Sequence, residues 1–155
     1  RAYDPAENPE QRPQEILQET IEKILDKIEE SHRPVLSPGN GVRLAGAIRE
    51  FHELVDVLGV PVVTGMSSVD ALESAHPYFV GRSGGTGTRP GNFSLQNSDV
   101  LLSIGNRQGF AQTGFQYQDW ARESYTILND IDENELKKPN LHVSLPVVVR
   151  NKRDC

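Results

Sequence analysis

The stretch Val100-Leu101-Leu102-Ser103-Ile104-Gly105 is a short apolar run that stops at a glycine. The run is apolar at nearly every position rather than at alternate ones, which is typical of a strand covered on both faces. Similar short runs occur at three other places along the chain. Strands are therefore predicted at residues 33–38, 60–64, 100–104 and 125–128.

Apolar residues at helical spacing lie between these strands. They predict a helix over residues 14–30, a second over 44–58 that ends at Gly59, and a shorter one near 92–97. Strands that alternate with helices indicate a parallel sheet of βαβ units. We expect a three-layer α/β sandwich with a mainly parallel, doubly wound, Rossmann-like sheet. The two longer helical stripes are Leu17, Ile21, Ile24, Leu25, Ile28 and Leu44, Ile48, Phe51, Val55, Leu58.

Length and composition limit the class of protein. The chain has 155 residues, of which 36% are hydrophobic and 25% charged, as in a single globular domain. Its apolar runs are far shorter than a membrane span, so no membrane association is expected. The first residue is Arg1 and the single methionine is Met66, which suggests a piece of a longer protein. The single cysteine, Cys155, excludes an internal disulfide and favours a reducing, cytoplasmic setting.

The net charge of −6 is concentrated at the start, where residues 1–31 hold nine acidic and four basic side chains. A strongly basic face is missing, so nucleic acid is not an expected partner. Prolines among charged residues predict a linker over residues 1–13. The domain is expected over 14–148, with a short basic linker stub at 149–155.

Ligands of doubly wound sheets bind beyond the carboxyl ends of the strands. Gly39-Asn40-Gly41 follows the first predicted strand and suits either a turn that needs positive φ or a loop that faces a nucleotide. It lacks the third glycine of the dinucleotide fingerprint. The stretch 81–91 holds five glycines with Arg82 and Arg89, and is either a mobile connection or a loop that approaches a ligand. It lacks the Lys-Ser/Thr ending of a P-loop.

Two later strand ends carry charge. Arg107 follows Gly105 and either binds a pyrophosphate or lies on the surface. Asp130 is the better candidate for accepting hydrogen bonds from ribose hydroxyls. Asp132 has Glu135 three residues later, which indicates a helix cap.

No catalytic or metal-binding set is predicted. The four histidines show no ligand spacing, and no nucleophile has an evident base. Four aromatic residues crowd residues 106–124, where they either wall a site for a flat ring or pack over the end of the sheet. They are Phe110, Phe115, Tyr117 and Trp120.

Taken together, these strand ends resemble the central domain of thiamine-diphosphate-dependent enzymes, in particular the acetolactate synthase large-subunit branch. The resemblance covers residues 14–145 and rests on the ordered set rather than on any one motif. It implies two flanking domains in a parent enzyme, which bind the pyrimidine and the diphosphate of the cofactor with Mg²⁺. The Gly-Asp-Gly motif of the diphosphate-binding domain does not occur in this sequence, so this chain alone is not expected to be catalytic.

The resemblance also leaves a nucleotide site open, because central domains of this family hold FAD, ADP or nothing. Gly39-Asn40-Gly41 stands where a run of glycines is usual, and Ser83-Gly84-Gly85-Thr86-Gly87 is also atypical. Carried over by position, phosphate or adenosine contacts fall on Gly39, Asn40, Gly41 and nearby Thr64, flavin contacts on Gly84 and Gly87, and further contacts on Gly105, Arg107 and Asp130.

Two functions from different classes follow. The first is a non-catalytic central domain of a 2-oxo-acid decarboxylase or carboligase, which joins the flanking domains within a homo-oligomer and offers an FAD or ADP site. The second is a free-standing dinucleotide-binding module of the electron-transfer flavoprotein or transhydrogenase type. A purely structural partner domain is a third alternative.

Overall fold

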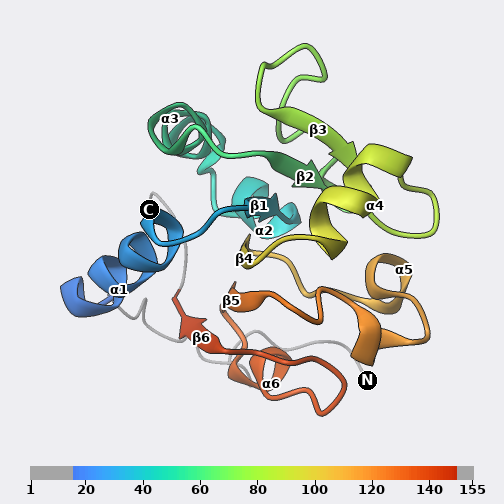
Figure 1. Cartoon of the computed structure of the whole chain (residues 1–155). Coiled ribbons are helices and arrows are strands. Elements are labelled where there is room, and N and C mark those ends of the chain that lie inside the picture. The colour runs from blue at the N-terminus through green and yellow to red at the C-terminus, as the bar shows by residue number, and fades with distance from the viewer. Residues whose placement is uncertain (1–15, 150–155) are drawn as a thin grey trace, which may run out of the picture.

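The computed structural model describes residues 16–149, so the predicted linker at 1–13 and all but the first residue of the predicted stub at 149–155 lie outside the described residues. Six parallel strands form one sheet in the order β3-β2-β1-β4-β5-β6 (Figure 1). This is the doubly wound order, in which the chain reverses direction across the sheet between β1 and β4. The strands are β1 (Pro34–Pro38), β2 (Val62–Thr64), β3 (Phe79–Arg82), β4 (Val100–Ile104), β5 (Tyr125–Asp130) and β6 (Leu145–Val148).

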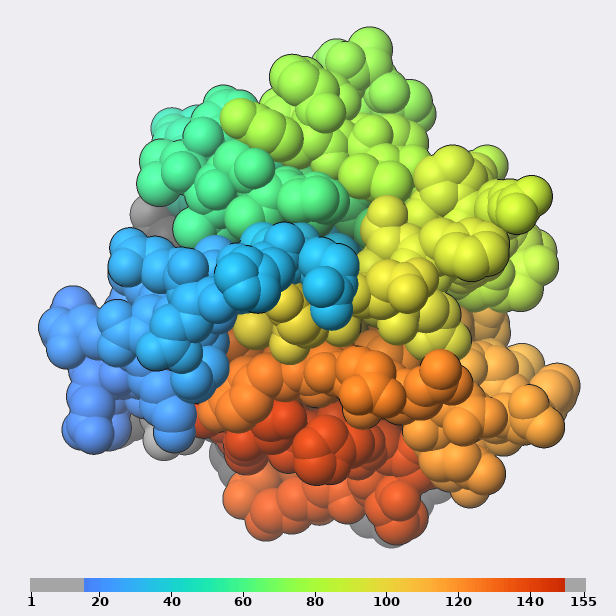
Figure 2. Space-filling view, viewed as in Figure 1, coloured from blue at the N-terminus to red at the C-terminus, as the bar shows by residue number. Residues whose placement is uncertain are grey.

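Helices and short 3₁₀ turns connect the strands. Figure 2 shows one face of the molecule, on which residues near 40 lie between the segments near 60–100 and those after 120. The first strand of the chain is thus central in space. The helices are α1 (Gln18–Glu29), α2 (Asn40–Leu44), α3 (Ile48–Leu58), α4 (Arg89–Gln96), α5 (Phe110–Thr113) and α6 (Glu133–Leu136), with 3₁₀ turns η2 (Met66–Ser68) and η3 (Tyr117–Asp119).

Alternate side chains of the strands enter two separate cores. Leu36 and Leu102 are paired across β1 and β4 and pack with α1 and α3 on one face. Val35 and Leu101 point to the other face, where they pack with α4, α6 and the buried Trp120. Both faces are covered, so the predicted three-layer sandwich is confirmed.

All four predicted strands are present, but β3 and β6 were not predicted. Both are edge strands, and their sequences carry Gly81 and Pro146, which weaken a strand pattern. The helix predicted over 44–58 begins later, at Ile48 of α3, because Leu44 ends the separate short helix α2. Gly46, at φ 68°, separates α2 from α3. Gly59 ends α3 in the left-handed conformation at φ 61°, as predicted.

The first glycine loop also differs from the prediction. Gly39 is extended, with φ −109° and ψ −178°, so positive φ is not why glycine is needed there. A Cβ at Gly39 would lie 2.1 Å from the carbonyl oxygen of Gly105, and one at Gly41 would lie 2.7 Å from its Cα. These residues are glycines because two backbone segments meet with no room between them.

At the amino-terminal end of the sheet, one carboxylate accepts hydrogen bonds from the segment that joins α1 to β1. Asp99 precedes β4 and accepts hydrogen bonds from the hydroxyl of Ser31 and from the backbone N–H groups of His32 and Arg33, both at 2.9 Å. Partial burial raises the pKa of Asp99, but these hydrogen bonds outweigh it and lower the pKa to about 2. Asp99 thereby fixes the junction between α1 and β1.

Candidate functional site

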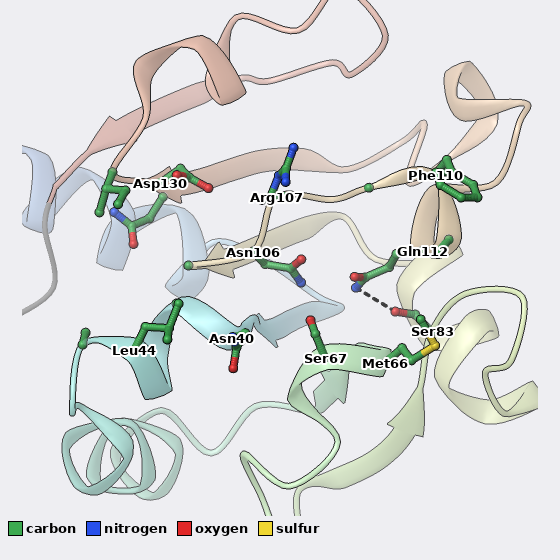
Figure 3. A pocket seen from close by; sticks show the side chains of 17 residues that line it. Asn40, Leu44, Met66, Ser67, Ser83, Asn106, Arg107, Phe110, Gln112 and Asp130 are labelled. Atoms are coloured by element: carbon green, nitrogen blue, oxygen red, sulfur yellow. Dashed lines mark hydrogen bonds between the residues drawn. The ribbon is translucent and has the colours of Figure 1, made fainter. Parts of the chain in front are cut away.

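A cavity of about 640 Å³ opens at the carboxyl ends of the strands, around the β1–β4 switch point (Figure 3). Residues that follow β1, β2, β3 and β4 line it together with the end of β5. Its volume lies within the usual range for small-molecule sites, roughly 300–1,000 Å³. The lining residues are Asn40, Gly41, Leu44, Ala45, Met66, Ser67, Ser83, Gly105, Asn106, Arg107, Gly109, Phe110, Ala111, Gln112, Asn129, Asp130 and Ile131.

The floor of the cavity is backbone. Gly41 donates its N–H to the carbonyl oxygen of Gly105 at 2.9 Å, and Gly39 donates to Ile104 at 2.8 Å. Gly105 itself has φ 58° and lies so close to Gly41 that a side chain would not fit. The two backbone segments therefore pack directly against each other at the switch point, which glycine allows because it has no side chain.

Exposed apolar side chains stand at both ends of the cavity. Leu44 and Ile131 are 70% and 55% exposed at one end, and Met66 and Phe110 are 63% and 72% exposed at the other. Phe110 also stacks on Phe115, with ring centroids 5.9 Å apart. Apolar surface of this kind beside a cavity is what flat rings pack against.

The segment around α5 forms the wall at the Phe110 end. Gln112 donates from Nε2 to the hydroxyl of Ser83 at 2.9 Å, as the dashed line in Figure 3 shows. Gly85 donates its N–H to the carbonyl oxygen of Ala111 at 3.1 Å. These two hydrogen bonds join the segment after β4 to the glycine-rich turn after β3.

Arg107 and Asp130 are the charged side chains among the described lining residues. Arg107 lies at the rim, with its guanidinium directed away from Asn40 (Figure 3). It forms an ion pair with Glu135 of α6 at 2.9 Å. Asp130 accepts a hydrogen bond from the N–H of Asp132 at 3.0 Å. Partial burial raises the pKa of Glu135, but its hydrogen bonds with Lys138 and Arg107 outweigh this and lower it.

Buried amides support the loop that carries Arg107. Asn106 is 8% exposed and accepts from the N–H of Gln108 at 3.2 Å. Gln108 is 2% exposed, has φ 50° and donates to the hydroxyl of Ser103 at 2.8 Å. A non-glycine residue held in this conformation has a backbone determined by its surroundings. The hydrogen bonds of Asn106 and Gln108 thus fix the backbone of the loop that carries Arg107.

Five of the nine predicted site residues line the cavity: Asn40, Gly41, Gly105, Arg107 and Asp130. Gly39 lies just beneath the floor. Thr64 is fully buried, and its hydroxyl has no hydrogen-bond partner among the described residues. The other two predicted residues, Gly84 and Gly87, belong to a packed turn.

The glycine-rich stretch 81–91 is shorter as a loop than its sequence suggests, because its ends belong to β3 and α4. The side-chain amide of Asn92 accepts from the N–H of Gly84 at 2.8 Å and donates to its carbonyl oxygen at 3.1 Å. Asp132 caps α6 as predicted, by accepting from the N–H of Asn134 at 2.9 Å. Its capping box is incomplete, because Glu135 turns to Arg107 and Lys138 instead.

The aromatic residues of 106–124 divide between the two predicted roles. Phe110 lines the cavity, whereas Trp120 is buried in the core beside α4 and α6. Sequence reasoning missed Met66, Gln112 and Asn129 as lining residues. Asn129 lies in β5 beside the predicted Asp130, whereas no local signal marks Met66 in η2 or Gln112 in α5, which only the folded sheet brings together.

Within residues 16–149, no group of three or more histidine, cysteine or acidic side chains is placed to hold a metal ion. Within the same residues, no helix combines the length and the apolar character that a membrane span requires.

Comparison with known proteins identifies the class. The family described as "Thiamine pyrophosphate enzyme, central domain" matches residues 21–153, and the chain belongs to this family. The resemblance seen in the strand ends is therefore confirmed.

Individual relatives carry a more specific name. The chain is 38% identical over 121 residues to a "Probable acetolactate synthase large subunit" of Methanococcus aeolicus, which covers 78% of this chain and 20% of that protein. It is 30% identical over 119 residues to the "Acetolactate synthase isozyme 2 large subunit" of Escherichia coli K12, which covers 76% of this chain and 22% of that protein. The chain thus spans about a fifth of the length of these relatives.

Proposed function

We propose that the chain is the non-catalytic central domain of a thiamine-diphosphate-dependent 2-oxo-acid decarboxylase or carboligase, and that its cavity is a site for FAD or ADP. The observation that carries the second half is the position of the cavity. It lies at the switch point of the sheet, where doubly wound folds bind nucleotides. Family membership and the acetolactate synthase relatives support the first half.

The residues fit such a ligand in three respects. Gly41 and Gly105 line the cavity where two backbone segments pack together, so a diphosphate placed there would face peptide groups. Asp130 keeps an acceptor for a ribose hydroxyl, and Arg107 is the cation within reach of a phosphate. The apolar pairs at the two ends suit the rings of a nucleotide. These contacts bind and orient the ligand.

Catalysis is assigned to other domains of the parent enzyme. In such an enzyme thiamine diphosphate, held with Mg²⁺, supplies the carbanion-stabilising chemistry. The cavity described here has Arg107 and Asp130 as its charged lining groups, with no nucleophile paired to a base. The contribution of this domain is to connect the flanking domains and to hold a nucleotide in its cavity.

Calorimetric titration of the chain with FAD, ADP and NAD tests the nucleotide site. Saturable binding of FAD or ADP, weakened at least tenfold in Gly41→Val, is the expected result, because the new side chain must displace the Gly105 backbone. Gly85→Val is the control, since a Cβ there meets open space. Binding of NAD alone favours the free-standing dinucleotide module. No binding of any of the three rejects the nucleotide site and leaves the scaffold role.

The catalytic assignment has its own test. The gene product that contains this chain is assayed with thiamine diphosphate, Mg²⁺ and a panel of 2-oxo acids that begins with pyruvate. Release of CO₂ is expected. No release from any acid of the panel would reject the proposed reaction class.

A further inference from the structure

Arg107 is engaged on the side away from the cavity. Its Nη2 lies 2.9 Å from Oε1 of Glu135, and its side chain is 74% exposed. Among the described lining residues it is the one cation. An anionic group that recruits this guanidinium into the cavity would draw Arg107 away from Glu135, and the cost of that exchange would bear directly on affinity.

Glu135 has a second cation. Nζ of Lys138 contacts the other carboxylate oxygen of Glu135 and also donates a hydrogen bond to the backbone oxygen of Arg107 at 3.1 Å. Both Glu135 and Lys138 are mostly buried, at 18% and 23% exposed. Lys138 thus stays attached to the Arg107 loop whether or not the guanidinium remains in place.

We propose that Glu135 is an exchangeable counter-ion, which holds Arg107 at the rim until a phosphate of the ligand replaces it, while Lys138 keeps Glu135 neutralised. The proposal rests on the proposed nucleotide site and specifies how that site handles anionic charge. Arg107 is exposed, so water or a phosphate solvates its charge when it leaves Glu135, and its release costs little on the Arg107 side. Glu135 is not exposed, and without Lys138 the release would strand a partly buried charge.

This arrangement predicts opposite effects for two neighbouring charges. Glu135→Gln frees Arg107 in advance and should tighten ADP binding about two- to fivefold. Lys138→Gln leaves Glu135 with Arg107 as its remaining cation, so release becomes harder and ADP binding should weaken roughly three- to tenfold. Adenosine, which carries no phosphate, should bind both variants as it binds the unmodified chain.

A change of net charge alone would also shift ADP affinity. Charged residues in and just after α6 offer matched controls. Lys137 and Glu133 carry the same charges as Lys138 and Glu135, but they form an ion pair with each other, at 2.6 Å, whereas Arg107 pairs with Glu135. Glu133→Gln and Lys137→Gln should therefore change ADP affinity by less than about 1.5-fold, because salt screens the effect of a distant surface charge.

The decisive measurement is a double-mutant cycle by calorimetry with ADP and adenosine as probes. In an Arg107→Gln background, Glu135→Gln should no longer improve ADP binding, because there is no guanidinium to release. Circular dichroism and thermal melts confirm that each variant is folded.

The outcomes separate the two proposals. If Glu135→Gln improves ADP binding equally with and without Arg107, or if Glu133→Gln matches it, a general field explains the effect and the exchange is overturned. If ADP and adenosine bind but no variant changes their ratio, the exchange is overturned and the nucleotide site stands. If the unmodified chain binds neither ADP nor adenosine while it is folded, the nucleotide site fails and the exchange falls with it.

Discussion

The two ends of the sheet are built in different ways. At the amino-terminal end Asp99 gathers three hydrogen bonds and fixes α1 against β1. At the carboxyl end a floor of closely packed glycine backbone lies under a rim of exposed apolar side chains, with the exposed Arg107 paired to the mostly buried Glu135. One end satisfies its polar groups internally, whereas the other leaves surface uncovered, as a binding site must. The hydrogen bonds of one side chain fix the amino-terminal end, whereas close backbone packing fixes the carboxyl end beneath the proposed nucleotide site.

The largest effect should come from the floor, which is the rigid part of the carboxyl end. Gly39→Ala would place a Cβ 2.1 Å from the Gly105 carbonyl oxygen, so β1 and β4 must separate there. We expect a loss of about 3 kcal/mol in the free energy of unfolding, measured by urea denaturation. Gly85→Ala, whose Cβ meets open space, should change it by less than about 0.5 kcal/mol. Equal effects of the two would show that the floor is not tightly packed.

Asp99→Asn tests the amino-terminal end. The amide can still accept hydrogen bonds, but it loses the charge and turns N–H groups toward donors. We expect a loss of about 1–2 kcal/mol of stability at pH 7, after allowance for partial exposure. The measurement is again urea denaturation, with Asp119→Asn on the exposed η3 turn as the control. An unchanged midpoint for Asp99→Asn would mean that this carboxylate does not fix the junction.

The pH dependence of stability should reveal the same carboxylate. The pKa of Asp99 is lowered from 3.8 to about 2 in the folded chain, so its contribution is complete above pH 4 and is lost as the pH falls toward 2. The stability difference between the unmodified chain and Asp99→Asn should accordingly shrink between pH 4 and pH 2. Urea midpoints at pH 7, 4, 3 and 2.5 measure it. A difference that stays constant over this range contradicts the assignment.

The smallest effect is expected at the rim. Gln112→Ala removes the hydrogen bond to Ser83 and should cost less than about 1 kcal/mol of overall stability. Its effect should be local: the Gly85 amide, which donates to Ala111, should exchange several-fold faster with solvent. The amide of Leu36 in the central strand should exchange as before. Gln118→Ala, on the exposed η3 turn, serves as the control.

The sequence predicts the central strands of the sheet but not its edge strands. Strands such as β1 and β4 are buried on both faces, so their apolar runs are visible without any knowledge of the fold. The edge strands β3 and β6 have one neighbour each, and Gly81 and Pro146 are tolerated there because an edge makes weaker demands. A strand that is covered on both faces shows a continuous apolar run in the sequence, whereas these two edge strands show no such run.

The site was predictable only where its position follows from strand ends. Gly41, Gly105, Arg107 and Asp130 each come directly after or at the end of a recognisable strand, and all four line the cavity. Met66 and Gln112 reach it from loops whose paths depend on Gly-rich turns and on β3. Such contacts between distant segments have no local sequence signature, so reasoning from the sequence could not supply them.

The position of the chain's single tryptophan makes the two cores distinguishable in solution. Trp120 is 7% exposed and belongs to the core under α4 and α6, with none of its neighbours in the core under α1 and α3. Its fluorescence therefore reports on one layer of the sandwich, while circular dichroism reports on all helices and strands. Coincident unfolding curves from the two signals would show that the layers melt as one cooperative unit.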